Sequence, residues 1–162
     1  SAVAFTYKGD IYTVPTTGGT ARQLTTNAAY DTHPVWSPDS KRLAFCSNRE
    51  GSMDVYVMQR EGGTPRRLTT NSNSETPIAF KDNNTVLYTS SIIPSAKSII
   101  FANRMLPQVY EVGTNGSRPH LFSALPMMDI SIRPNGDLLY HDQKGYEDPW
   151  RKHHRSPITR DI

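Results

Sequence analysis

Hydrophobic and polar residues alternate along most of this chain in runs of only a few positions. Residues 54–58 (DVYVM) are a clear example, and they are rich in β-branched and aromatic side chains. A period of two places successive side chains on opposite faces of a strand. No segment shows a convincing helical spacing, so the pattern predicts an all-β chain.

The alternating runs belong to an internal repeat. Residues 10–27 and 54–71 share an Asp-apolar-Tyr run, a Gly-Gly-Thr turn and the string Leu-Thr-Thr-Asn, all at a constant offset of 44. A weaker copy at residues 108–117 has an offset of 54 from the second. About ten residues are therefore inserted, and residues 91–100 are the natural place for them.

A second element repeats out of phase with the first. Residues 34–45, 77–88 and 130–140 each hold an apolar run, a turn of Pro, Asp, Asn or Gly, and another apolar run. This pattern is typical of a hairpin. Together the two elements give four short strands per period, expected in the second unit near residues 32–36, 42–47, 54–58 and 65–68. The Gly-Gly pairs are expected to close the outer hairpins with positive φ.

Four strands in about 44 residues is the period of a β-propeller blade. The prediction is a β-propeller with four-stranded antiparallel blades and about three and a half blades, an incomplete ring. It treats residues 1–162 as a single partial propeller, with units at about 1–27, 28–71, 72–123 and 124–162. The first unit starts at the position of a second strand and the last reaches a third, so three, four, four, and two or three strands are expected.

An open arc exposes edge strands, which are templates for pairing with another chain. Closed propellers typically have four to eight blades, so this chain cannot close alone if the period is right. We therefore expect either a fragment of a longer protein or edge-to-edge self-association.

Residues 34–58 resemble the propeller repeat of TolB and of tricorn-type proteases. They carry Trp36-Ser37-Pro38-Asp39, the strand Leu43-Ala44-Phe45, Ser47-Asn48-Arg49, and residues 54–58. Ser40 departs from the pattern, which often has Gly there. Residues 144–154 and 159–162, with residues 7–12, look like the N-terminal propeller of bacterial tricorn-like peptidases, a resemblance that covers essentially the whole chain.

The resemblance implies a noncatalytic propeller module of a tricorn-like serine peptidase, whose catalytic domain belongs to the C-terminal-processing peptidase family. Such a module guides or gates peptide substrates and contacts the downstream domains of the same polypeptide, so the catalytic residues are expected beyond Ile162. A periplasmic or secreted location is also implied. The alternative is a TolB-like module of the bacterial envelope that binds proteins without enzymatic activity.

Composition narrows the partners further. Lys plus Arg is 18 and Asp plus Glu is 15, a net charge of +3. This small surplus argues against nucleic acid, which requires a clustered basic face. The apolar runs are far too short to predict a membrane span. A single cysteine excludes an internal disulfide and a four-thiolate zinc site, and no spacing indicates a catalytic, cofactor or metal site.

One segment breaks the repeat with a run of cations beside an aromatic residue. The candidate recognition loop consists of Trp150, Arg151, Lys152, His153, His154 and Arg155. Loops on a rigid scaffold often carry recognition, and these groups suit an acidic peptide end, a phosphate or a neighbouring domain. A solvated surface loop is the alternative.

Other polar residues are interpreted as structural. Asp39 is expected to bind turn amides through a buried hydrogen bond, and Arg49 to tie the next hairpin. Asp54 has a counterpart in Asp10, and a catalytic site would not recur in every blade.

The histidines and the cysteine receive the same structural interpretation. His33, His120 and His141 are expected to be strand residues hydrogen-bonded to neighbouring turns, because no other ligand stands at metal-binding spacing. Cys46 lies in an apolar strand and is expected to be a buried small hydrophobe rather than a nucleophile.

Overall fold

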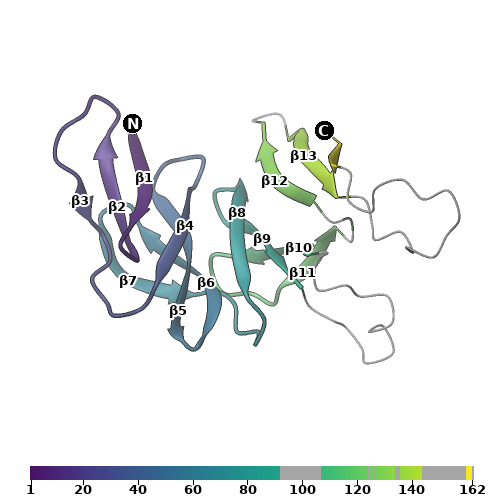
Figure 1. Cartoon of the computed structure of the whole chain (residues 1–162). Coiled ribbons are helices and arrows are strands. Elements are labelled where there is room, and N and C mark those ends of the chain that lie inside the picture. The colour runs from purple at the N-terminus through teal and green to yellow at the C-terminus, as the bar shows by residue number, and fades with distance from the viewer. Residues whose placement is uncertain (92–106, 124, 126, 134–135, 144–159, 162) are drawn as a thin grey trace, which may run out of the picture.

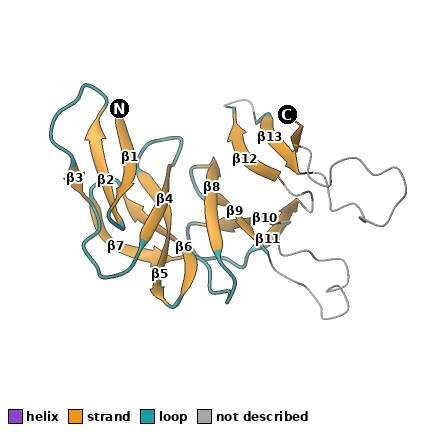
Figure 2. Ribbon diagram, in the orientation of Figure 1, coloured by secondary structure: helices purple, strands orange, loops and turns teal. Residues whose placement is uncertain are grey.

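The computed structural model describes residues 1–91, 107–123, 125, 127–133, 136–143 and 160–161 (Figure 1). The described residues form strands joined by loops and turns, with no helix among them (Figure 2). In chain order the strands are β1 (Ala2–Tyr7), β2 (Asp10–Pro15), β3 (Arg22–Gln23), β4 (Asp31–Trp36), β5 (Arg42–Glu50), β6 (Ser52–Gln59), β7 (Gly62–Arg67), β8 (Glu75–Asp82), β9 (Thr85–Ser90), β10 (Gln108–Gly113), β11 (His120–Ser123), β12 (Met127–Ile132), β13 (Leu138–Gln143) and β14 (Arg160–Asp161).

The strands form four separate antiparallel sheets. The first sheet is β1–β3, the second β4–β7, the third β8–β11 and the fourth β12–β14. Each is a meander in which neighbours in sequence are hydrogen-bonded neighbours. The all-β, blade-like architecture predicted from the repeat is confirmed, and so is the expected sequence of three-, four-, four- and three-stranded units in the described residues.

The first strand of each later sheet lies against the sheet before it. β4 packs against β1 and β2, β8 packs against β4, β5 and β6, and β12 packs against β8. The sheets thus follow one another in chain order, as Figure 1 shows. The expected ten-residue insertion falls between β9 and β10, where residues 92–106 lie outside the described residues.

Apolar side chains fill the two interfaces of the second sheet. Leu43 and Phe45 of β5 pack with Ile11 of the first sheet, whereas Ala44 between them packs with Val86 and Tyr88 of the third. A sheet covered on both faces needs apolar residues at successive positions, unlike one with a solvated face. The continuous run Leu43–Cys46, all at most 1% exposed, follows from this double burial.

A stacked aromatic pair recurs at the same place in three sheets. The pairs are Phe5–Tyr12, Phe45–Tyr56 and Tyr88–Tyr110, with ring centroids 5.8, 6.0 and 5.7 Å apart. Each pair joins directly opposed residues of two neighbouring strands, where side chains of one face come closest. The repeat in the sequence is therefore also a repeat in packing.

Tight turns use positive backbone angles where the sequence supplies glycine. Gly18 and Gly19 lie between β2 and β3 and have positive φ, as expected for an outer hairpin. Gly62 and Gly63 also have positive φ, but they are the first residues of β7, and the turn of that hairpin falls on Arg60 and Glu61 instead. Ser40, in the turn between β4 and β5, has a φ of 56° without being glycine.

Candidate functional site

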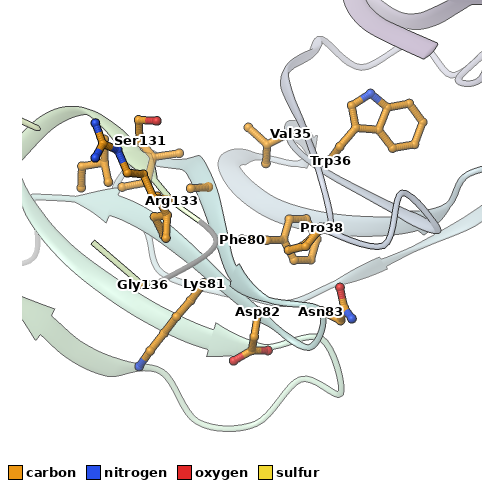
Figure 3. Close-up of a pocket in the computed structure, with 14 residues that line it drawn as sticks. Val35, Trp36, Pro38, Phe80, Lys81, Asp82, Asn83, Ser131, Arg133 and Gly136 are labelled. Atoms are coloured by element: carbon orange, nitrogen blue, oxygen red, sulfur yellow. The ribbon is translucent and has the colours of Figure 1, made fainter. Parts of the chain in front are cut away.

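The ends of β4, β8 and β12 enclose a cleft of about 710 Å³ (Figure 3). Val35, Ile78, Ile130 and Ile132 give it apolar walls. Lys81 and Asp82 at the end of β8, and Arg133 directly after β12, bring charged groups to its rim. The cleft is formed by three sheets together, because each contributes its first strand.

Each of these three strands is the edge strand of its sheet in the described residues. An edge strand presents backbone N–H and C=O groups that an extended peptide can pair with. Peptide recognition by strand addition uses such edges for affinity and neighbouring pockets for side-chain selection. The cleft therefore has the chemistry to hold an extended peptide segment.

The charged groups at the rim differ in how far they are already paired. Lys81 Nζ lies 2.7 Å from Glu111 Oε2 and 5.2 Å from the centroid of the Phe122 ring. Asp82 Oδ1 accepts a hydrogen bond from the Asn84 amide. Within the described residues the exposed Arg133 guanidinium makes no ion pair, so it is the cation available to an incoming anion.

The edge strands also contain β-bulges. The pairing register shifts between Thr32 and Val35 in β4, and between Met128 and Ser131 in β12. His33 and Asp129 lie within these shifts, with φ of 54° and 51°. Bulges re-aim side chains, and both residues are exposed. His33 thus lies inside β4, where its Nδ1 is 3.6 Å from Sγ of Cys46, a residue of the neighbouring strand β5 and not of a turn.

Cys46 is only 1% exposed, and burial raises the pKa of its thiol to about 12. A thiol that stays protonated is a poor nucleophile. The expectation of a buried cysteine is confirmed.

The acidic and basic residues of the repeat have structural partners, with one correction. Asp39 accepts hydrogen bonds from Ser37 Oγ and the Lys41 amide, which lower its pKa, but Asp39 is exposed and the predicted buried hydrogen bond is wrong. Arg49 binds Asp31, at the start of β4, and its guanidinium also lies over Tyr56 of β6, in the next hairpin. Asp54 pairs with Arg67, whose Nη2 lies 2.7 Å from Asp54 Oδ2.

The other candidate residues predicted from the sequence are the recognition loop and two histidines. The candidate recognition loop, from Trp150 to Arg155, lies outside the described residues. His120 is exposed at the start of β11, and His141 Nδ1 lies 2.9 Å from Asp129 Oδ2. Among the described residues, no group of three metal-ligating side chains comes together. No helix of the described chain is long and apolar enough to cross a membrane.

Two buried acids, Asp31 and Glu75, are not among the residues predicted from the sequence; they are 44 residues apart and start β4 and β8. Asp31 is paired with Arg49. Among the described residues no cation forms an ion pair with Glu75, and burial raises its pKa to about 7. The constant offset of the repeat is the signal that could have identified this pair of positions.

The family model of the tricorn protease N-terminal β-propeller domain matches residues 1–162. A putative TolB from Agrobacterium tumefaciens is 26% identical with a TM-score of 0.65, over 87% of this chain and 49% of its own. The TolB of Acinetobacter baumannii is 17% identical with a TM-score of 0.66, over 88% of this chain and 35% of its own. A tricorn protease is 16% identical with a TM-score of 0.68, over 99% of this chain and 17% of its own. This chain thus spans about half, or less, of each of these proteins.

Proposed function

Because this chain belongs to the family of tricorn protease N-terminal β-propeller domains, we propose that it guides or gates peptide substrates for a peptidase without carrying out catalysis itself. The cleft at the ends of β4, β8 and β12 is the proposed peptide site. The peptide and the downstream domains of the parent polypeptide are the proposed partners.

The observation that carries this proposal is the convergence of three edge strands on one cleft. Main-chain pairing with an edge strand binds peptides with little regard to their sequence. Such tolerance suits a module that admits many substrates. Arg133 adds a preference for a negative group, which every peptide carries at its free carboxyl end.

The test is a titration of the 162-residue chain with two versions of one extended peptide, one with a free C-terminal carboxylate and one amidated. We expect the carboxylate form to bind about tenfold more tightly, since a hydrogen-bonded charge pair contributes roughly 1.5 kcal/mol. Arg133→Gln should remove that preference and leave the weaker, main-chain part of the binding.

The matched control is Arg118→Gln, which removes an exposed arginine that does not line the cleft. It should bind both peptides as the unmodified chain does. Equal affinity of the unmodified chain for both peptides would remove Arg133 from the site. Absence of binding to either peptide would contradict the peptide-guiding role itself.

The resemblance to the Agrobacterium TolB supports a second candidate, a protein-binding module without a link to proteolysis. Both candidates use the same cleft and edge strands, but they differ in what the chain should do to a peptidase. Deleting this propeller from its parent would change which peptides are cleaved in the first case. It would leave cleavage unchanged, or reveal no peptidase activity at all, in the second.

A further inference from the structure

The second sheet contains a complete receptor for one guanidinium group, that of Arg49. Arg49 Nη2 donates to both carboxylate oxygens of Asp31 at 3.1 Å, and Nε donates to Ser47 Oγ at 2.9 Å. The guanidinium carbon lies 4.6 Å from the centroid of the Tyr56 ring and 5.5 Å from that of Phe45. A buried carboxylate, a hydroxyl and a stacked aromatic pair thus hold a single cation.

The third sheet repeats every part of this receptor. Glu75 opposes Ser90 across β8 and β9, as Asp31 opposes Ser47 across β4 and β5. Two positions before Ser90, Tyr88 stacks on Tyr110, at the places that Phe45 and Tyr56 hold in the second sheet. Directly opposed residues and residues two apart share one face, so the carboxyl, hydroxyl and aromatic groups belong to the same face.

The third sheet has no arginine at the position that Arg49 holds in the second sheet. The string Ser47-Asn48-Arg49 corresponds to residues 90–92, which read Ser-Ser-Ile. The charge of Arg67 acts on the Glu75 carboxyl group. The Arg67 guanidinium, however, is already bound to Asp54 and to the Thr69 carbonyl oxygen, at 2.7 and 2.8 Å. The acid at this position is retained without the base that pairs with it in the preceding sheet.

Three polar atoms of this group have no hydrogen-bond partner in the described part of the chain. They are Glu75 Oε2, Tyr88 OH and Ser90 Oγ, on residues that are 1%, 0% and 2% exposed. Buried polar atoms are usually paired, and an unpaired one requires an explanation. Each of the three atoms can accept a hydrogen bond, and a guanidinium carries five N–H donors.

We propose that Glu75, Ser90, Tyr88 and Tyr110 form a binding site for the guanidinium group of a peptide arginine. Charge, hydrogen bonding and stacking then act as they do for Arg49 in the second sheet. The site lies at the start of β8, whereas the cleft is formed by residues nearer the end of that strand. The inference therefore stands independently of the proposed peptide-guiding function.

Calorimetric titration of the 162-residue chain at pH 8 with Nα-acetyl-arginine amide tests the proposal. Its neutral isostere, Nα-acetyl-citrulline amide, is the matched ligand. We expect saturable binding of the arginine compound, at least tenfold tighter than that of the citrulline compound. Glu75→Gln should weaken arginine binding at least tenfold, while Glu61→Gln, at an exposed carboxylate, should leave it unchanged.

A second variant keeps the test decisive if Glu75→Gln does not fold. Ser90→Ala leaves the carboxylate in place and should weaken binding about threefold to tenfold through one lost hydrogen bond. Arg133→Gln should not alter it, which separates this site from the cleft. The proposal is overturned if the chain does not bind the arginine compound, binds citrulline equally well, or is unaffected by both Glu75→Gln and Ser90→Ala.

The pH dependence gives an independent readout. Burial first of all raises the pKa of Glu75 to about 7; nearby Asp54 raises it further, whereas Thr69 and Arg67 lower it. Its other titratable neighbours, Tyr88 and Tyr110, have raised pKa values and stay neutral below pH 8. Arginine affinity should therefore fall about tenfold from pH 8 to pH 6, as Glu75 loses its charge. A flat profile would contradict the role of Glu75.

Discussion

Single residues in this protein contribute most to its stability where they carry or pair with a buried charge. The Asp31 side chain is fully buried and that of Arg49 is 19% exposed, whereas the Arg22–Glu61 pair has exposures of 58% and 76%. Water screens an exposed pair, so its loss changes little. Loss of one partner of a buried pair leaves an uncompensated charge, and that is costly.

Arg49→Ala should accordingly lower the free energy of unfolding by about 3 kcal/mol. Arg22→Ala, at the exposed pair, should lower it by less than about 1 kcal/mol. Adding Asp31→Asn to Arg49→Ala should recover part of the loss, because the double variant no longer buries a charge. Chemical denaturation of the four proteins measures this. Equal small losses in both arginine variants would show that Asp31 does not depend on Arg49.

At the scale of elements, the turn between β4 and β5 is strained, because Ser40 holds a backbone conformation that glycine would adopt more easily. Ser37 Oγ and Asp39 Oδ1 hold the turn through hydrogen bonds to each other and to Arg42 and Lys41. The Ser40 amide donates a hydrogen bond to the Ser37 carbonyl oxygen. The Ser40 φ of 56° is one that glycine adopts freely and that other residues adopt at a cost.

Ser40→Gly should therefore raise the free energy of unfolding by about 0.5 to 1 kcal/mol, the strain removed less the added entropy of the unfolded chain. Ser74→Gly is the matched control, because Ser74 is exposed and does not have a positive φ. It should lower stability by about 0.5 kcal/mol through the entropy term alone. A loss of stability in Ser40→Gly similar to that of the control would show that this turn is not strained.

The elements also show what sequence reasoning can reach. The predicted strands at residues 32–36 and 42–47 match β4 and β5 closely, because alternation and turn residues are local signals. The bulges at His33 and Asp129 were not predicted, since they depend on the register between two strands. Arg49 and Asp31 are 18 residues apart, so only strand pairing brings them together.

The cleft was out of reach for a related reason. Val35, Ile78 and Ile130 come from three different repeats, and they meet only once the sheets have packed. Much of what such a site provides for a peptide is backbone N–H and C=O groups at strand edges. No residue type in the sequence indicates where such groups will lie. The sequence therefore predicted blades well, and the site that lies between blades was found only in the structure.

For the whole molecule, the first sheet exposes a face that is covered in the second and third sheets. The Phe45–Tyr56 pair packs under the first sheet, and Tyr88 packs under the second. The equivalent face of the first sheet carries the Phe5–Tyr12 pair, and there Val3 and Tyr7 are 50% and 55% exposed. Large exposed apolar patches mark contact surfaces, so this face is suited to another sheet.

We propose that copies of this chain associate through that face, with an apolar face such as that of Leu139, 56% exposed in the fourth sheet, as its complement. Such a head-to-tail contact joins unlike surfaces and can be extended from copy to copy. Sedimentation should then show a mass that rises with protein concentration. The double variant Val3→Glu, Tyr7→Glu should remain monomeric, because it places charge where an apolar face must dock.

Leu121→Glu is the control, because Leu121 is 52% exposed but lies in β11, the outermost strand of the third sheet. It should associate as the unmodified chain does. If it abolished association as fully as the double variant, the contact would be nonspecific apolar adhesion. A monomeric mass for the unmodified chain at every concentration would instead mean that the exposed face of β1 and β2 does not attract a second copy, and that a covering sheet has to come from elsewhere.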